Sequence, residues 1–323
     1  MLLCINYADE KFRPWQQLQS QTAYLFGADK VREYSPKDIP VDFYEKNKFI
    51  LNQSRGAGYW LWKPWIIKDA LSNINEGDYV FYVDSGAFYI YNTPPLIAAM
   101  ENANTDVMCF SMPPHLEKTF SKRDAFILMD CDKEEYINSP QRCATFLLLK
   151  KTINSVALID EFLWYAQDPR IITDMPNQLG KENYNGFKDN RHDQTIWSLL
   201  TKKKNIKPFR DPSQFGIFYD YPRDVLERSI YPTIICSHRR NMRNRMYTHL
   251  VPQLIFVAKN LIPREFQEGL ALLVEDYIKL YNKSVFPYNM PNEQQILNSY
   301  YELNIPETPF LREALSHLST SFK

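Results

Sequence analysis

The 323-residue sequence is poor in glycine and has no paired-cysteine motif. Its nine glycines stand beside 21 tyrosines, 20 phenylalanines and six tryptophans, which makes a stiff, aromatic-rich chain suited to filling a core or to stacking on flat sugar and base faces. Four of its five cysteines lie in apolar, strand-like runs, and none forms a C-x-x-C pair: Cys4, Cys109, Cys131, Cys143 and Cys236. We therefore expect buried free thiols in a reducing compartment, which excludes a disulfide or zinc framework.

A net charge and long apolar runs are also lacking. Lys+Arg and Asp+Glu both total 38, so no global field recruits nucleic acid or an anionic membrane, and any such binding has to be local. The chain begins at once with a strand-like run and has no signal-like segment, and no run reaches the roughly 18 apolar residues of a membrane span. A cytoplasmic protein is expected.

Strand-like and helix-like segments alternate along the first part of the chain. The patterns predict strands at 2–7, 30–34, 79–84, 107–111, 144–150 and 233–237, and helices at 15–26, 43–52, 65–74, 153–165 and 194–200. Such alternation predicts an α/β fold with a mainly parallel sheet and helices on both faces. Residues 1–249 are expected to form the catalytic domain, and residues 250–323, where helical patterns are broken by prolines, a C-terminal helical appendage.

Several familiar catalytic motifs are missing. No Gly-x-Ser-x-Gly elbow, His-Glu-x-x-His pair or cysteine metal motif occurs, which disfavours hydrolases and zinc enzymes. The glycine-bearing turn at 55–58 is too short for a dinucleotide fingerprint, so we expect it to turn the chain sharply, with Arg55 free to reach a phosphate. Lys63 stands beside Pro64 at a predicted helix start, where it either faces an anion or extends its ammonium into solvent.

Two carboxylates stand at element ends. The apolar strand predicted at 79–84 ends at Asp84, followed by Ser85 and Gly86. At the carboxyl end of a buried central strand, an aspartate either faces the ligand crevice, where it holds a cation or a ribose, or caps the next turn. Asp193, at the start of a predicted helix, is likewise either its N-cap or a general base.

A basic cluster follows the strand predicted at 233–237. His238 is followed by four arginines, Arg239, Arg240, Arg243 and Arg245. This density indicates a local polyanion site in a chain without net charge, whereas the alternatives are a solvated basic loop or a membrane-surface patch. A neutral His238 and Asp84 together would make a partial metal site, completed by diphosphate oxygens and water.

In this order, the segments resemble nucleotide-sugar glycosyltransferases of the GT-A type, and more narrowly the bacterial and viral enzymes of capsule, O-antigen or lipopolysaccharide biosynthesis. The resemblance covers residues 1–245 and is carried by the segments 58–64, 82–86, 119–124, 145–148 and 192–194. It implies a GT-A-like, Rossmann-like sheet and a hexosyltransferase. The implied donor is a nucleoside diphosphate sugar, with UDP expected, and the implied acceptor is a hydroxyl of a glycan or of a lipid-linked sugar.

The resemblance also implies roles for individual residues. Asp84 matches the first carboxylate of the Asp-x-Asp motif, with Gly86 where the second is expected. Either Asp84 and His238 share a divalent cation, Mn²⁺ or Mg²⁺, or cationic side chains neutralise the diphosphate without one. Asp193 matches the catalytic base of inverting enzymes, and inversion is favoured over retention. The further donor or nucleotide contacts implied are Asn6, Tyr7, Arg55, Tyr59, Lys63, Ser85, Gly86, Lys122, Arg123, Asp124, Arg239 and Arg240.

Other interpretations stay open. The incomplete Asp-x-Asp motif also fits a non-catalytic nucleotide-sugar or glycan-binding protein with a degenerate GT-A fold. A nucleotidyltransferase shares the crevice, but residues 8–11 supply no glycine- and arginine-rich loop after the first strand. The apolar residues 254–257 beside the arginines leave room for peripheral association with the inner face of a membrane, although packing against the catalytic domain is the expected arrangement.

Overall fold

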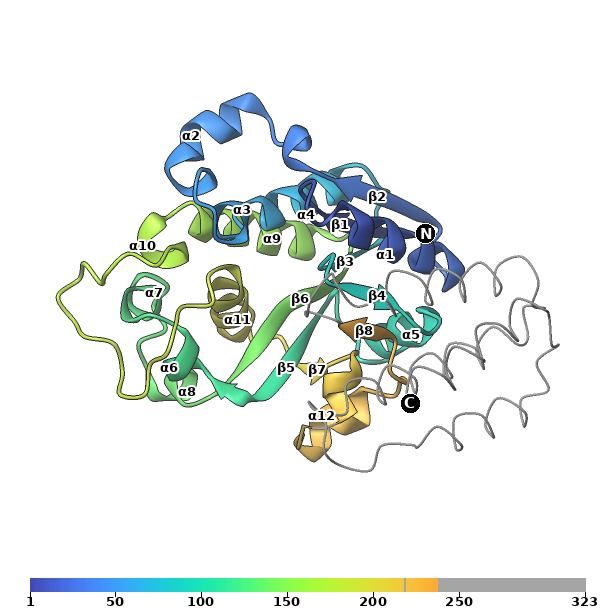
Figure 1. Cartoon of the computed structure of the whole chain (residues 1–323). Coiled ribbons are helices and arrows are strands. Elements are labelled where there is room, and N and C mark those ends of the chain that lie inside the picture. The colour runs from blue at the N-terminus through green and yellow to red at the C-terminus, as the bar shows by residue number, and fades with distance from the viewer. Residues whose placement is uncertain (218, 238–323) are drawn as a thin grey trace, which may run out of the picture.

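A six-stranded sheet in the order β2-β1-β3-β6-β5-β7 forms the centre of the computed structural model, which describes residues 1–217 and 219–237 (Figure 1). Strand β6 runs antiparallel to its neighbours β3 and β5, and the other neighbouring pairs are parallel. The prediction of an α/β fold with a mainly parallel sheet is therefore confirmed. The strands are β1 (Leu2–Tyr7), β2 (Lys30–Tyr34), β3 (Tyr79–Val83), β5 (Val107–Leu116), β6 (Pro140–Lys150) and β7 (Phe209–Arg210).

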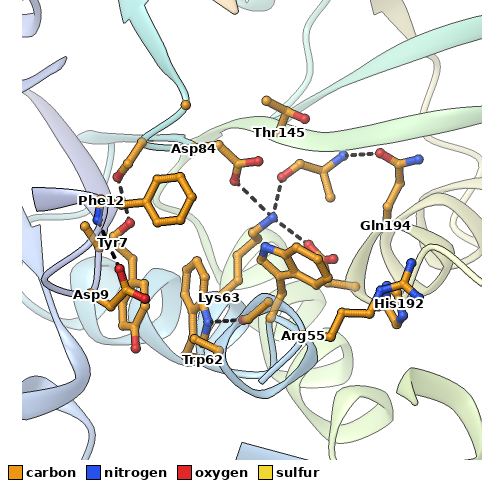
Figure 2. Close-up of a pocket in the computed structure, with 18 of the residues that line it drawn as sticks. Tyr7, Asp9, Phe12, Arg55, Trp62, Lys63, Asp84, Thr145, His192 and Gln194 are labelled. Carbon is orange, nitrogen blue, oxygen red and sulfur yellow. Dashed lines mark hydrogen bonds and ion pairs between the residues drawn. The ribbon is translucent and has the colours of Figure 1, made fainter. Parts of the chain in front are cut away.

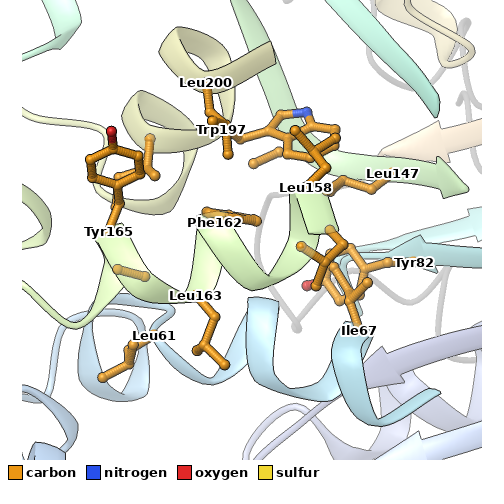
Figure 3. Packing of buried hydrophobic residues seen from close by; sticks show 14 of the residues in the cluster. Leu61, Ile67, Tyr82, Leu147, Leu158, Phe162, Leu163, Tyr165, Trp197 and Leu200 are labelled. Atoms are coloured by element: carbon orange, nitrogen blue, oxygen red, sulfur yellow. The ribbon is translucent and has the colours of Figure 1, made fainter. Parts of the chain in front are cut away.

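Each face of the sheet packs into its own hydrophobic core, because successive side chains of a strand point to opposite faces. In β3, Tyr82 belongs to one core and Phe81 to the other. The first face is covered by α4 (Trp62–Ser72), α9 (Ile153–Ala166) and α11 (Asp193–Lys203), and the second by α1 (Arg13–Leu25) and α5 (Pro94–Asn102). Figure 3 shows Phe162 of α9 and Trp197 of α11 packed together in the first core, with ring centroids 5.6 Å apart.

A separate two-stranded antiparallel sheet consists of β4 (Ala87–Tyr89) and β8 (Ile235–Ser237). The prediction that the strand at 233–237 belongs to the main sheet is therefore wrong. The backbone N–H groups of Ile234 and Ile235 both donate to the carbonyl of Pro212, and the Ile234 carbonyl accepts from Ile90, so this segment is held beside β4.

Short helices connect these elements. They are η1 (Pro36–Asp38), α2 (Val41–Leu51), α3 (Gly56–Tyr59), α6 (Glu117–Phe120), α7 (Arg123–Leu128), α8 (Glu134–Ile137), α10 (Pro169–Ile172), η2 (Gln214–Ile217) and α12 (Arg223–Arg228). Between α10 and α11 the chain runs for twenty residues without a helix or strand, and this segment, residues 173–192, is called the crossing segment below.

Some sequence predictions concern other parts of the chain. The expected helical appendage at 250–323 and its boundary with residues 1–249 lie outside the described residues. All five cysteines are described, and they are buried and not disulfide-bonded, as predicted. Within residues 1–217 and 219–237, no helix has the length and apolar character needed to cross a membrane.

Candidate active site

A cavity of about 550 Å³ lies where β1 and β3 end. Its wall contains Tyr7, the last residue of β1, and Asp84, which directly follows β3. The wall also contains the turn at 54–57, the start of α4, residues 144–145 of β6, the end of the crossing segment and the first two residues of α11 (Figure 2). In α/β proteins the crevice beyond the carboxyl ends of parallel strands is where ligands bind, so this cavity is the candidate site.

Lys63 lies at the centre of the site, in the first turn of α4 (Figure 2). Its Nζ donates to Asp193 Oδ2 at 2.5 Å and to the Ala144 carbonyl at 2.8 Å, and lies 3.2 Å from Asp84 Oδ1. Burial would lower the pKa of Lys63, but the two carboxylates outweigh it and raise the pKa, so the ammonium is charged. The side chain is only 2% exposed, so the alternative that it extends into solvent is wrong.

Asp193 is the first residue of α11, and the N-cap position belongs to His192. The alternative that Asp193 caps this helix is therefore wrong. Burial raises the pKa of Asp193 to about 6, against the opposing effect of the Lys63 ammonium. A carboxylate with a pKa near neutrality on the wall of a cavity is suited to accept a proton.

Asp84 is less deeply buried, with 26% of its side chain exposed. Its Oδ1 accepts a hydrogen bond from the Tyr82 hydroxyl at 2.5 Å and faces the Lys63 ammonium. Gly86 offers no side-chain ligand, and the described residues contain no group of three or more His, Cys, Asp or Glu side chains that could hold a metal. Of the two predicted metal ligands, the described residues thus contain Asp84. The other predicted diphosphate or metal ligands, His238, Arg239 and Arg240, lie outside the described residues.

The turn before α4 has left-handed backbone at five successive residues, 56–60, whose φ values lie between 50° and 97°. Hydrogen bonds from Tyr59 N to the Arg55 carbonyl and from Trp60 N to the Gly56 carbonyl close it. Each of its three non-glycine residues costs about 1–2 kcal/mol in this conformation. A Cβ atom at Gly56 would lie 2.3 Å from the Trp60 ring, so glycine is required there. The sharp turn predicted before the aromatic segment is confirmed.

His192 is a second strained position, with φ 57° and ψ −115°. Its ring lies against Tyr59 and Trp60, at centroid distances of 4.9 and 5.3 Å, and Nε2 is 3.0 Å from Asp174 Oδ1. Burial lowers the pKa of His192 to about 4, although Asp174 opposes this shift, so the ring is neutral and donates to Asp174. The left-handed turn at 56–60 and the strained residue His192 therefore pack against each other directly before Asp193.

Replacing Gly58 by Ala tests this turn. Its φ of 97° disfavours any side chain, and a Cβ atom would lie 2.7 Å from Leu51 Cα, so we expect the free energy of unfolding to fall by about 1–3 kcal/mol. The matched control is Ala57→Gly. Glycine relieves the left-handed strain in the folded state but also gives the unfolded chain more conformational freedom. The two effects offset each other, so the free energy of unfolding should change by less than about 1 kcal/mol. Urea denaturation measures both variants, and equal destabilisation would contradict the left-handed turn.

Aromatic rings form the wall beside β1. Tyr7 and Trp62 are stacked, with ring centroids 3.8 Å apart and an interplanar angle of 12°. The indole Nε1 of Trp62 donates to the Gly56 carbonyl at 3.0 Å, which ties the stack to the left-handed turn. Both residues line the cavity, and flat rings of this kind suit a nucleobase or a sugar ring.

Two arginines, Arg55 and Arg191, also line the cavity. Arg55, 46% exposed, donates to Asp174 Oδ2 at 2.9 Å and to Asp189 Oδ2 at 3.4 Å, and Arg191 Nε lies 3.4 Å from the same Asp189 oxygen. Arg55 was predicted to reach a phosphate, and its place on the wall is compatible with that role. Arg191 was not among the predicted contacts.

The predicted residues fall into two groups in space. Tyr7, Arg55, Lys63, Asp84, Ser85, Gly86 and Asp193 line the cavity. Asn6 and Tyr59 do not: the Asn6 amide is bound by Gln16, Gln19 and Ser20 of α1, and Tyr59 packs on His192. Asn6 therefore fixes α1 to β1.

The triplet Lys122, Arg123 and Asp124 also lies away from the cavity wall. Lys122 Nζ donates to the Met175 carbonyl, and Asp124 accepts from the backbone of Gln178 at 2.6 Å and of Leu179 at 3.3 Å. Arg123 pairs with Asp132 at 3.0 Å. The triplet thus anchors the crossing segment, which brings His192 and its carboxylate partners to the cavity.

Gln194 was not predicted as a contact but lines the cavity beside Asp193. Its Oε1 accepts from the backbone of Ala144 at 3.4 Å, and its Nε2 donates to Gln141 Oε1 at 2.8 Å. These bonds fix the start of α11 against β6. Gln194 directly follows Asp193 in the first turn of a predicted helix, and this position could have indicated from the sequence that it lines the site.

No protein-family model matches the chain, and no curated protein sequence matches it either. In fold the chain is similar to several solved glycosyltransferases. One is the bifunctional glycosyltransferase WbbM, with a TM-score of 0.43 and 8% identity over 74% of this chain and 46% of that one. A second is the galactosyltransferase LgtC, solved with donor and acceptor sugar analogues, with a TM-score of 0.45 and 12% identity over 82% of this chain and 99% of that one.

A third is the glycosyltransferase GlyE of Streptococcus pneumoniae, with a TM-score of 0.36 and 14% identity over 88% of this chain and 64% of that one. The chain therefore spans about half the length of WbbM and about two thirds of GlyE. Likeness at this level assigns no donor, acceptor or mechanism, so a function has to be inferred from the residues of the site.

Proposed function

We propose that the chain is a glycosyltransferase that moves a hexose from a nucleoside diphosphate sugar, UDP being the expected nucleotide, to a hydroxyl of a glycan or lipid-linked acceptor. One observation carries this proposal. Lys63 joins two carboxylates, Asp84 and Asp193, from different elements on the wall of one cavity at the ends of β1 and β3. The cavity of about 550 Å³ lies in the range of pockets for small ligands.

In the proposed reaction Asp193 takes the proton of the acceptor hydroxyl. The acceptor oxygen bonds to the anomeric carbon, the bond from that carbon to the diphosphate oxygen breaks, and the nucleoside diphosphate leaves with the electron pair. Inversion at the anomeric carbon follows from this single displacement. Lys63 keeps Asp193 oriented by a bond of 2.5 Å and holds its pKa below the value that burial alone would give.

In this proposal the donor binds to two groups of residues on the cavity wall. The stacked rings of Tyr7 and Trp62 receive a flat ring of the donor, and Arg55 and Arg191 receive the diphosphate. Negative charge develops on the leaving diphosphate in the transition state, so guanidiniums there stabilise the transition state more than the ground state.

Titration calorimetry with UDP, followed by assays of UDP-sugar hydrolysis and transfer, tests the proposal. We expect UDP to bind and UDP-sugars to be turned over, and Arg55→Gln to weaken UDP binding by about tenfold through loss of a charge-assisted hydrogen bond. Arg223→Gln is the control, because Arg223 is 92% exposed on α12 and outside the cavity. Titrations with and without Mn²⁺ show whether a divalent cation or cationic side chains alone neutralise the diphosphate.

A second function, a non-catalytic nucleotide-sugar or glycan-binding protein, is favoured by Gly86, which leaves the Asp-x-Asp motif without its second carboxylate. UDP binding without hydrolysis or transfer of any donor would establish that function instead. Absence of UDP and UDP-sugar binding would contradict the first function, and absence of glycan binding as well would contradict the second.

A further inference from the structure

A second cavity, of about 610 Å³, lies outside the proposed donor site. Its wall is formed by Lys46 of α2, by the end of α9, by α10, by Leu128 at the end of α7, and by Met175 and Gln178 of the crossing segment. It shares no lining residue with the first cavity. None of its lining residues has been assigned a role in donor binding or proton transfer.

An exposed tryptophan forms part of this wall. Trp164 is 66% exposed, whereas its neighbours on α9, Leu163 and Tyr165, are 9% and 7% exposed and belong to the core. The Tyr165 ring packs edge-on against the indole at 4.8 Å, with an interplanar angle of 72°. The indole is thus supported from the protein side and keeps most of its surface available to a flat apolar partner.

Fixed polar groups accompany the indole. Arg170 Nε and Nη2 lie 3.0 and 2.6 Å from the two oxygens of Asp168, and Asp168 also accepts from the Arg170 backbone at 2.9 Å. The opposite charges of this pair offset each other, which leaves directed donors and acceptors, and Lys46 is a further cationic residue on the wall. Gln167 and Gln178 also line the cavity, and the Gln167 amide is fixed by the Leu163 carbonyl at 3.2 Å and by Asn47 at 3.4 Å. An aromatic face with a few directed polar groups is the usual composition of a site for a neutral ligand with hydroxyl groups.

The crossing segment connects this cavity to the proposed active site. Asp174 binds Arg55 and His192 of the first site, at 2.9 and 3.0 Å, and the next residue, Met175, lines the second cavity. Asp174 itself lines neither cavity, so it connects two residues of the first cavity wall to the residue that begins the second. A ligand that contacts both cavities has to consist of several linked units.

We infer that the second cavity binds a neutral oligosaccharide, a distal part of the acceptor glycan, with Trp164 as its stacking surface. This inference rests on the proposed function and narrows the acceptor to a glycan of several sugar units. The pyranose face packs on the indole, and its hydroxyls bond to the Asp168–Arg170 pair and to the amides of Gln167 and Gln178.

Tryptophan fluorescence and calorimetry on the full chain test this directly, without the transfer reaction. The probes are maltohexaose, cellohexaose, mannohexaose and chitohexaose, each compared with its monosaccharide at millimolar concentration. We expect at least one hexasaccharide to bind, with its monosaccharide at least about tenfold weaker, and Trp164→Ala to weaken the hexasaccharide by about tenfold or more. Gln178→Ala should give a smaller loss in the same direction.

Ile153→Ala is the matched control, since Ile153 is on the same helix, 84% exposed and outside the cavity, and it should leave binding unchanged. Failure of every hexasaccharide to bind, or equal binding by wild type and Trp164→Ala, would overturn the inference. UDP binding is measured on the same samples and should be unaffected by Trp164→Ala. Loss of the proposed function appears as absent UDP binding and turnover, which is a different result from absent oligosaccharide binding.

Discussion

Replacing Asp193 by Asn is expected to lower kcat/KM for sugar transfer by about 10²- to 10⁴-fold, the usual contribution of a general base. The amide keeps the size of the side chain but cannot take the acceptor proton. Release of UDP from a UDP-sugar in the presence of acceptor measures the loss. Asp160→Asn is the matched control, because Asp160 pairs with Lys68 at 2.7 Å on the surface, where both side chains are about half exposed at 50% and 47%.

The same substitution should change the pH dependence. Burial raises the pKa of Asp193 to about 6, and the base acts in its deprotonated form, so kcat/KM of the wild type should rise with pH through about pH 6 and level off above it. This acidic limb should disappear in Asp193→Asn. Transfer at the wild-type rate, or an unchanged limb in the variant, would exclude Asp193 as the base.

Local patterns were sufficient to predict the strand ends from which the site is built. Apolar runs that stop at Tyr7 and Asp84 predicted two strands, and the topology brings their carboxyl ends to one edge because β1 and β3 are parallel neighbours. The left-handed turn at 56–60 was predicted from its glycines as a sharp turn. In each case the signal lies within a few residues of the feature.

The parts that sequence reasoning missed depend on contacts between distant residues. The charged triplet Lys122, Arg123 and Asp124 was predicted to face the donor, but most of its partners lie more than 50 residues further along the chain, such as Met175 and Asn183. Asp174 lies in the crossing segment, where no periodicity marks any residue, and only the fold brings it to Arg55 and His192. Residue type indicates what a side chain does, whereas its partner is set by the tertiary structure.

Lys63 shows the same limit most clearly, since a lysine at a helix start is ordinarily a surface residue. Replacing it by Met removes the cation between Asp193 and Asp84 while keeping the length of the side chain. Breaking a buried ion pair by removing one partner leaves an uncompensated charge, so we expect Lys63→Met to lower the free energy of unfolding by about 3–5 kcal/mol. In the wild type Lys63 lowers the pKa of Asp193, so this pKa should rise further in Lys63→Met. The acidic limb of the pH profile of kcat/KM should then move to higher pH.

A double-mutant cycle separates this charge effect from simple loss of packing. Adding Asp193→Asn to Lys63→Met removes the stranded carboxylate, so the double variant should be less destabilised than the sum of the single variants by roughly 1–3 kcal/mol. Lys68→Met with Asp160→Asn provides the control cycle, since that pair also starts from α4 but joins it to α9 at an exposed position, and its coupling should stay below about 1 kcal/mol. Additive effects in the Lys63 cycle would mean that the ion pair is not what holds α11 in place. Strong coupling at Lys63 together with weak coupling at Lys68 would show that burial, and not only the proximity of opposite charges, makes the ion pair strong. Lys63 would then be the residue that keeps Asp193 ionised on the cavity wall.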